Sequence, residues 1–173
     1  MNMSLEAFKI RVLPTKDKLF RFAFKILGDQ EEAQDVVQEV FIKVWNKRED
    51  MERLDNMEAW CMRVTRNLAL DRVKSSKRKL TDSLDQSFEM SMGEKETPYQ
   101  TTELSDTMNK IGRYIASLPE KQKHIIQLRD VEGYSYKEIC DILEIDINQV
   151  KVNLFRARKS VRENLLNENA YGL

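Results

Sequence analysis

The apolar residues of this chain recur at helical intervals over most of its length. A dense apolar stretch, Leu19–Leu27, stops at Gly28, a residue that commonly ends helices. Asp29 follows in the position of an N-cap, and Glu32 stands three residues later in a variant of the capping box. The pattern therefore predicts one helix that ends at Gly28 and a second that begins after Asp29.

The second predicted helix has one apolar and one polar face. The apolar residues lie at i, i+3, i+4, i+7 and i+8, which is typical of a helix with a buried stripe; they are Ala33, Val36, Val37, Val40, Phe41, Val44 and Trp45. The opposite face carries Asp35, Gln38, Glu39 and Lys43. Composition alone explains these polar residues as a solvated surface.

A charged loop is expected over Arg48–Asn56, followed by a further helix. Its apolar stripe is expected to consist of Met57, Trp60, Cys61, Val64 and Leu68. Another face carries polar and basic residues, which continue into a basic cluster: Arg63, Arg66, Asn67, Arg72, Lys74, Lys77, Arg78 and Lys79. Cations beside an aromatic ring suit single-stranded nucleic acid, because they hold phosphates while the ring stacks on a base. A solvated helix end is the alternative, and Trp60 also fits a core position.

Four more helices are expected in the C-terminal part of the chain. Apolar spacing predicts them over about 104–118, 120–131, 136–143 and 147–166, with Pro119 at the start of the second and Ser135 capping the third. The last helix has a predicted buried stripe of Val150, Leu154, Ala157, Val161 and Leu165. A short helix, a tight turn at Glu144–Asp146 and a longer helix form the plan of a helix-turn-helix.

The exposed face of the last helix has the chemistry of DNA recognition. Its residues are polar, basic or apolar: Gln149, Lys151, Val152, Phe155, Arg156 and Lys159. Polar and basic groups reach phosphates and base edges, and apolar groups contact thymine methyls. A helical hairpin with no role in DNA binding is the alternative.

Charge divides the chain into three parts although 29 basic and 29 acidic residues cancel. Residues 1–80 hold 17 basic and 13 acidic side chains, residues 81–106 hold 1 and 7, and residues 107–173 hold 11 and 9. The middle part has a net charge of −6 and lacks helical periodicity, so burial cannot offset its ordering entropy. We therefore expect an all-α chain of two small helical domains, 1–80 and 107–173, joined by a flexible acidic linker at 81–106.

Composition argues against several functional classes. No apolar run exceeds four residues, so neither a membrane span nor a signal peptide is expected. Cys61, Cys140 and the single His124 do not match the spacing of a zinc site or a catalytic triad. We expect no metal, no cofactor and no enzymatic activity, and a cytoplasmic or otherwise reducing location.

Two motifs resemble bacterial RNA polymerase sigma factors. Residues 118–122, 129–139 and 150–158 resemble region 4 of that family, with the sequences LPEKQ, RDVEGYSYKEI and VKVNLFRAR. Residues 35–45, DVVQEVFIKVW, resemble region 2, and Ala59-Trp60, Arg66-Asn67 and Asp71-Arg72 match its continuation. A chain that holds only these two regions is similar to the extracytoplasmic-function group.

The resemblance implies a role for each surface. Region 2 would dock on core RNA polymerase through Asp35, Gln38, Glu39 and Lys43. It would open and hold the −10 element through Asn56, Trp60, Arg63, Arg66, Asn67, Arg72 and Lys74. Region 4 would bind the −35 duplex through Ser135, Tyr136, Gln149, Lys151, Val152, Phe155 and Arg156. Promoter DNA and an anti-sigma factor are the other implied partners, and the polymerase would supply the catalysis.

Two departures from the family pattern limit how far promoter preference transfers. Glu144 occupies a turn position commonly filled by Gly, where a positive φ would cost roughly 1 kcal/mol. Val152-Asn153 replaces a more polar pair. A stand-alone helix-turn-helix regulator would explain residues 105–167 but not Asp35–Trp45, and a helical protein-binding adaptor is a third possibility.

Overall fold

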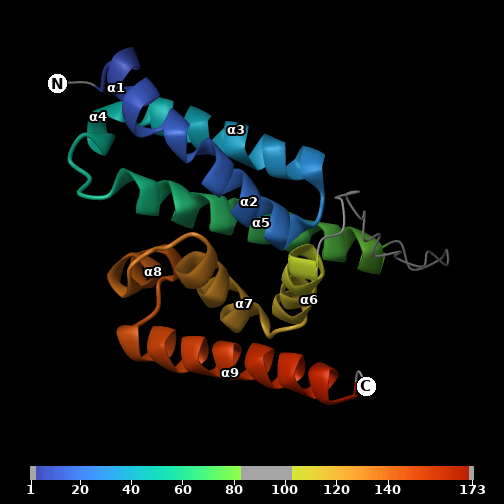
Figure 1. Ribbon diagram of the computed structural model, residues 1–173. Coiled ribbons are helices and arrows are strands. Elements are labelled where there is room, and N and C mark those ends of the chain that lie inside the picture. The colour runs from blue at the N-terminus through green and yellow to red at the C-terminus, as the bar shows by residue number, and fades with distance from the viewer. Residues whose placement is uncertain (1–2, 83–102, 172–173) are drawn as a thin grey trace. The chain divides into compact units, whose positions relative to one another are not determined.

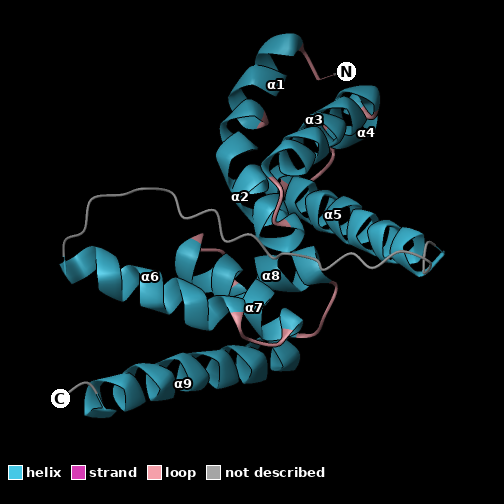
Figure 2. Ribbon diagram, turned by 90° about the vertical axis from the view of Figure 1, so that its right-hand side faces the viewer, coloured by secondary structure: helices cyan, strands magenta, loops and turns pink. Residues whose placement is uncertain are grey.

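The computed structural model describes residues 3–82 and 103–171, and within these ranges every regular element is a helix (Figure 2). The chain divides into two compact units. The first contains α1 (Leu5–Arg11), η1 (Leu13–Thr15), α2 (Lys16–Leu27), α3 (Gln30–Asn46), α4 (Arg48–Met51), α5 (Met57–Asp82) and nearly all of α8 (Tyr136–Leu143). The second contains α6 (Glu103–Ala116), α7 (Glu120–Ile126), η2 (Gln127–Val131) and α9 (Ile147–Tyr171). The expected all-α class is confirmed.

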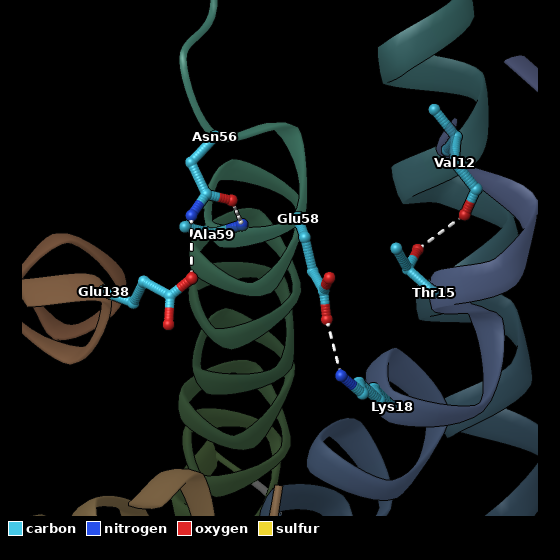
Figure 3. Close-up of polar contacts among 7 residues, drawn as sticks. All are labelled: Val12, Thr15, Lys18, Asn56, Glu58, Ala59 and Glu138. Atoms are coloured by element: carbon cyan, nitrogen blue, oxygen red, sulfur yellow. Dashed lines mark hydrogen bonds and ion pairs between the residues drawn. The ribbon is translucent and has the colours of Figure 1, made fainter. Parts of the chain in front are cut away.

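Helix α2 organises the first unit by contacting both α3 and α5 (Figure 1). Its core side chains Leu19, Phe22 and Ala23 are fully buried. The predicted stripe of α3 is buried at Ala33, Val36, Val37, Val40 and Val44, whereas Phe41 is half-buried and Trp45 is 36% exposed. The Lys18 ammonium lies 3.0 Å from Glu58 Oε1 and so joins α2 to α5 (Figure 3).

The junction between α2 and α3 has the predicted caps. Gly28 has φ +69°, and its N–H donates to the Phe24 carbonyl at 2.7 Å. The Asp29 carboxylate accepts from the Glu32 N–H at 2.9 Å. A left-handed residue is inexpensive for Gly, and the carboxylate satisfies one of the free donors at the start of α3. Both predicted helix ends are therefore confirmed.

Helix α5 buries a face that overlaps the expected stripe in part. Cys61, Met62, Thr65 and Ala69 are buried there together with Met57 and Ala59. Of the expected stripe, Met57 and Cys61 are buried, whereas Trp60, Val64 and Leu68 are half-buried. Four of the six buried side chains, Ala59, Cys61, Thr65 and Ala69, are small, and α5 contacts both α2 and α3.

Two short helices of the first unit were not predicted. Phe8 of α1 makes edge-to-face contacts with Phe41 at 5.9 Å and Trp45 at 5.7 Å between ring centroids. Arg48 begins α4 where a charged loop was expected. Met51 is buried there, and the Lys47 carbonyl accepts from its N–H at 3.1 Å, which fixes this single turn.

In the second unit, α9 contacts both α6 and α7 (Figure 2). The predicted stripe of α9 is buried at Val150, Leu154, Ala157 and Val161, while Leu165 is half-buried. The helix continues to Tyr171, beyond the predicted end at Leu166. Instead of one α-helix to Val131, α7 ends at Ile126 and gives way to the π-helical η2, in which the Glu132 N–H donates to the Gln127 carbonyl at 3.0 Å.

The expected linker contains two helix ends, since Asp82 ends α5 and Glu103 begins α6. Its remaining residues, 83–102, lie outside the described part of the chain.

Candidate polymerase and nucleic-acid interfaces

The polar face of α3 is accessible as predicted. Asp35 and Gln38 are exposed, and Glu39 and Lys43 are half-exposed. The side chains of Asp35 and Glu39 retain 65% and 42% of their accessible surface. One turn of helix separates these carboxylates, so they form an anionic surface opposite the buried stripe.

Arg72 of α5 joins this anionic surface. Its guanidinium nitrogens lie 3.4 Å from Glu39 Oε2 and 4.0 Å from Asp35 Oδ2. The structure thus brings a residue predicted to bind −10 DNA against two residues predicted to bind the polymerase. Because all three side chains keep access to solvent, these pairs are weak and can be exchanged for other partners.

The remaining residues predicted for −10 binding lie on or just before α5. Asn67 and Lys74 are exposed, whereas Trp60, Arg63 and Arg66 are half-buried. Asn56 caps α5, because its Oδ1 accepts from the Ala59 N–H at 2.9 Å (Figure 3). Trp60 is not among the fully buried core residues, so its ring keeps a surface that another molecule can contact.

The N-terminal half of α9 presents the predicted recognition face. Asp146 Oδ1 accepts from the Gln149 N–H at 2.9 Å and so caps the helix. Val152 is 45% exposed and Phe155 is 66% exposed. The neighbouring Lys151 and Arg156 are exposed as well, while the opposite side of α9 is buried. Large apolar groups beside cations on an exposed helix face are suited to DNA bases and phosphates.

Other predicted −35 residues have contacts within the second unit. Gln149 Oε1 accepts from Lys121 Nζ at 3.1 Å. The Arg129 guanidinium covers the Tyr136 ring at 5.0 Å from its centroid, and its Nη1 donates to the Tyr134 carbonyl at 2.8 Å. Ser135 is exposed at the start of this segment. Lys121 and Arg129 were not predicted to support the recognition face.

Arg158 was also missed as a residue that positions α9. Its Nε and Nη2 donate to the two carboxylate oxygens of Asp130 at 2.9 and 2.6 Å. This bidentate pair links α9 to η2, and its hydrogen bonds raise the pKa of Arg158 above the usual value. No local sequence signal identifies a pair of residues 28 positions apart.

Neither a metal centre nor a membrane-spanning helix is found in the described ranges. Within residues 3–82 and 103–171 no group of His, Cys, Asp and Glu could hold a metal ion. Over the same ranges no helix is long and apolar enough to cross a membrane.

Comparison with known families divides the chain into two regions. Residues 12–79 match sigma-70 region 2, and residues 108–161 match sigma-70 region 4. The first match contains the α3 face and most of α5, and the second contains α7, α8 and most of α9. The two regions together, in this order, define a two-domain sigma factor.

Similar proteins give the same result over most of the chain. An ECF RNA polymerase sigma factor, SigL of Mycobacterium tuberculosis, is 30% identical over 83% of this chain and 80% of its own length. SigE of Mycolicibacterium smegmatis is 30% identical over 86% of this chain, but the aligned part is 58% of that protein. The sigma factor RpoE of Bartonella quintana, solved with its anti-sigma factor NepR, has a TM-score of 0.73 and 27% identity over 93% of this chain and 98% of its own.

The chain belongs to the sigma-70 family of bacterial RNA polymerase sigma factors, within the extracytoplasmic-function group. It is a transcription initiation factor that directs RNA polymerase to promoters. A stand-alone helix-turn-helix regulator would leave the region 2 match at residues 12–79 without a role.

Proposed function

We propose that this sigma factor divides promoter recognition among three helical faces. The α3 polar face binds core polymerase, α5 and Asn56 hold the opened −10 strand, and α9 binds the −35 duplex. The observation that carries the proposal is the recognition face of α9, where Val152 and Phe155 are exposed beside Lys151 and Arg156.

Docking on core polymerase is supported by the charge and accessibility of α3. Asp35, Gln38 and Glu39 can accept hydrogen bonds from cationic and amide groups of a partner, and Lys43 can donate to a carboxylate. Within the described part of the chain, Arg72 lies 3.4 Å from Glu39 and 4.0 Å from Asp35, and both pairs are open to solvent. A basic polymerase surface would therefore displace Arg72 at little cost.

Binding of the −10 strand is supported by the chemistry of α5. Arg63, Arg66, Arg72 and Lys74 supply cations for phosphates, while Asn67 can hydrogen-bond to a base edge or the backbone. Trp60 keeps enough exposed surface for its ring to contact an unpaired base.

Recognition of the −35 duplex is supported by the position of each side chain on α9. Gln149, Lys151 and Val152 lie in the first turns of the helix, where recognition helices contact base edges. Phe155 and Arg156 continue the same face by one turn. Tyr136 begins α8 and Ser135 immediately precedes it, and both would contact the DNA backbone.

A protein inhibitor is a further proposed partner. The similar RpoE of Bartonella quintana was crystallised with an anti-sigma factor. We propose that an anti-sigma factor likewise binds this chain in the cytoplasm, where it acts on the polymerase and DNA, and that all catalysis belongs to the polymerase.

Reconstituted transcription tests the proposal. The purified full chain is added to core RNA polymerase with a library of promoter fragments, and transcripts are sequenced. We expect initiation from one class of promoter that shares −10 and −35 sequences. Phe155→Ala and Arg156→Ala should relax selection at the −35 positions, with a cost of about 1–3 kcal/mol for each lost base contact.

Arg113→Ala is the matched control, because it removes an exposed cation from α6 of the same unit. It should leave promoter selection unchanged. Initiation without promoter selection, or unchanged −35 selection in the Phe155 and Arg156 variants, would contradict the assignment of α9.

A further inference from the structure

An acidic side chain of η2 is bonded to the helix proposed to bind DNA. Asp130 accepts hydrogen bonds from Arg158 Nε and Nη2 of α9 at 2.9 and 2.6 Å, through both of its carboxylate oxygens. The Asp130 side chain keeps 35% of its accessible surface and the Arg158 side chain keeps 51%. A negative charge next to such a helix repels phosphates and lowers affinity for any duplex. The benefit of this carboxylate therefore lies in something other than affinity for DNA.

The backbone that carries Asp130 is held firmly on both sides. Leu128 is fully buried, and its carbonyl accepts from the Tyr134 N–H at 3.0 Å. The Tyr134 carbonyl in turn accepts from Arg129 Nη1 at 2.8 Å, and the Tyr134 side chain is buried. Single π-helical turns such as η2 occur frequently at functional sites. Asp130 is thus a fixed point from which a neighbouring helix can be oriented.

The core contacts of α9 specify its rotation about its own axis less strictly than a polar contact does. Its buried side chains are apolar, and apolar attraction is non-directional; they are Val150, Leu154, Ala157 and Val161. A rotation of about 15° would move a group about 6 Å from the helix axis by about 1.5 Å. A binding site tolerates displacements of only about 0.5 Å.

The pair of Arg158 with Asp130 supplies the missing direction. A bidentate contact between a guanidinium and a carboxylate fixes geometry as well as distance. Arg158 follows Phe155 by three residues, so the pair acts directly beside the exposed recognition face of α9.

We infer that Asp130 is a positioning residue that sets the rotation of α9 for selection of the −35 sequence, acting through Arg158. The inference rests on the proposed −35 role of α9 and adds a specificity determinant that does not itself contact DNA. Partly exposed ion pairs contribute little to stability, so loss of the pair should alter selection and leave the fold intact. Loss of selection without loss of affinity distinguishes a positioning residue from one that contacts DNA.

Competition between two promoters tests the inference. Core RNA polymerase and the full chain are given equal amounts of a promoter that the unsubstituted chain selects and the same promoter with its −35 positions permuted. Asp130→Asn should lower the ratio of the two transcripts about tenfold, which is the discrimination that one bidentate base contact supplies. Arg158→Lys should lower it as well, because lysine keeps the charge but cannot form the bidentate pair. The double variant should lower it no further, because both substitutions remove one interaction.

Affinity and stability are measured on the same variants. Anisotropy titrations with a fluorescein-labelled duplex of random sequence should show that Asp130→Asn binds at least as tightly as the unsubstituted chain, because a negative charge is lost. Urea unfolding followed by circular dichroism should show an unchanged midpoint. Glu163→Gln is the matched control, since it also neutralises a carboxylate, but one whose ion pair with Lys159, at 3.8 Å, lies within α9 alone. It should leave the transcript ratio unchanged.

An unchanged transcript ratio in Asp130→Asn would overturn the inference. A loss of selection accompanied by weaker binding of the random duplex, or by a lower unfolding midpoint, would also overturn it, since these results assign Asp130 to DNA contact or to stability. If the unsubstituted chain itself failed to distinguish the two promoters, the proposed −35 role of α9 would be wrong instead.

Discussion

At the scale of single residues, the buried hydroxyls of Thr15 and Thr65 are satisfied by carbonyls three and four residues earlier in the chain. Thr15 Oγ1 donates to the Val12 carbonyl at 2.6 Å (Figure 3), and Thr65 Oγ1 donates to the Cys61 carbonyl at 2.8 Å. These hydrogen bonds offset the desolvation of both hydroxyls, which would otherwise cost about 1–3 kcal/mol each. Cys61, whose carbonyl accepts from Thr65, is itself buried as a free thiol.

The Cys61 thiol should be unreactive in the folded chain. Burial, with a smaller contribution from the nearby Glu58 charge, raises the pKa of Cys61 to about 12. A thiol reagent at pH 8 should therefore modify Cys61 in urea but not in buffer, as measured by mass spectrometry of its peptide. Modification of Cys61 in the folded protein would contradict its burial.

The same pKa shift predicts a loss of stability at alkaline pH. Below pH 9 the Cys61 thiol is protonated in both the folded and the unfolded chain. Above pH 9 it ionises first in the unfolded chain, which stabilises that state, so the free energy of unfolding falls as the pH rises toward 12. The loss should reach about 1 kcal/mol at pH 10 in urea titrations. Cys61→Ala should lack this component of the pH dependence.

At the scale of elements, local hydrogen bonds determine where the helices begin and end. Asp29 and Asp146 each accept from a backbone N–H three residues later, at 2.9 Å. Glu144, between α8 and α9, has φ +56°, which confirms the left-handed turn considered from the sequence. A side chain with a Cβ carries a steric cost there that Gly avoids.

Substitution at Glu144 should measure this cost. Glu144→Gly should be about 1 kcal/mol more stable to urea than Glu144→Ala, because both lack the carboxylate and only Gly relieves the left-handed strain. Circular dichroism during urea titration provides the measurement. Equal stability of the two variants would mean that the turn adopts another conformation in solution.

At the scale of the whole molecule, the proposed surfaces differ in charge, apart from Arg72, which lies against the α3 carboxylates. The α3 face is anionic, whereas α5 and α9 present cations. A protein that binds polymerase and DNA at the same time needs this separation, because like charges would repel one of its two partners.

Substitutions on the two units should therefore have separate effects. The pair Asp35→Lys and Glu39→Lys should lower affinity for core polymerase in a competition assay, without unfolding the chain. Phe155→Ala should leave core affinity unchanged but weaken selection of the −35 sequence. If either variant lost core affinity and −35 selection to the same extent, the assignment of these two functions to different helices would be wrong.

The acidic segment is proposed to occupy a basic channel of the polymerase. Its net charge of −6 over residues 81–106 comes from the sequence alone. Neutral replacements at Asp82, Asp85, Glu89, Glu94 and Glu96 should alter initiation or promoter escape more than affinity for duplex DNA, since a polyanion is repelled by the duplex. Abortive-transcript assays and anisotropy titrations would measure the two effects, and an effect on duplex affinity alone would contradict the proposal.

The sequence by itself determined the helical class, the C-terminal end of α2, the start of α3, and the buried stripes of α3 and α9. These features depend on apolar periodicity and on caps within one turn, so neighbouring residues suffice to specify them. The candidate surfaces on α3 and α9 followed from the same periodicity, because a residue opposite a buried stripe is exposed.

Only the tertiary structure decided the features that depend on distant residues. Which face of α5 is buried depends on its contacts with α2 and α3, and Phe8 contacts rings more than thirty residues away. The pairing of Arg158 with Asp130 likewise needs η2 and α9 to meet in space. Periodicity offers several acceptable faces for such helices, and packing against a partner selects one of them.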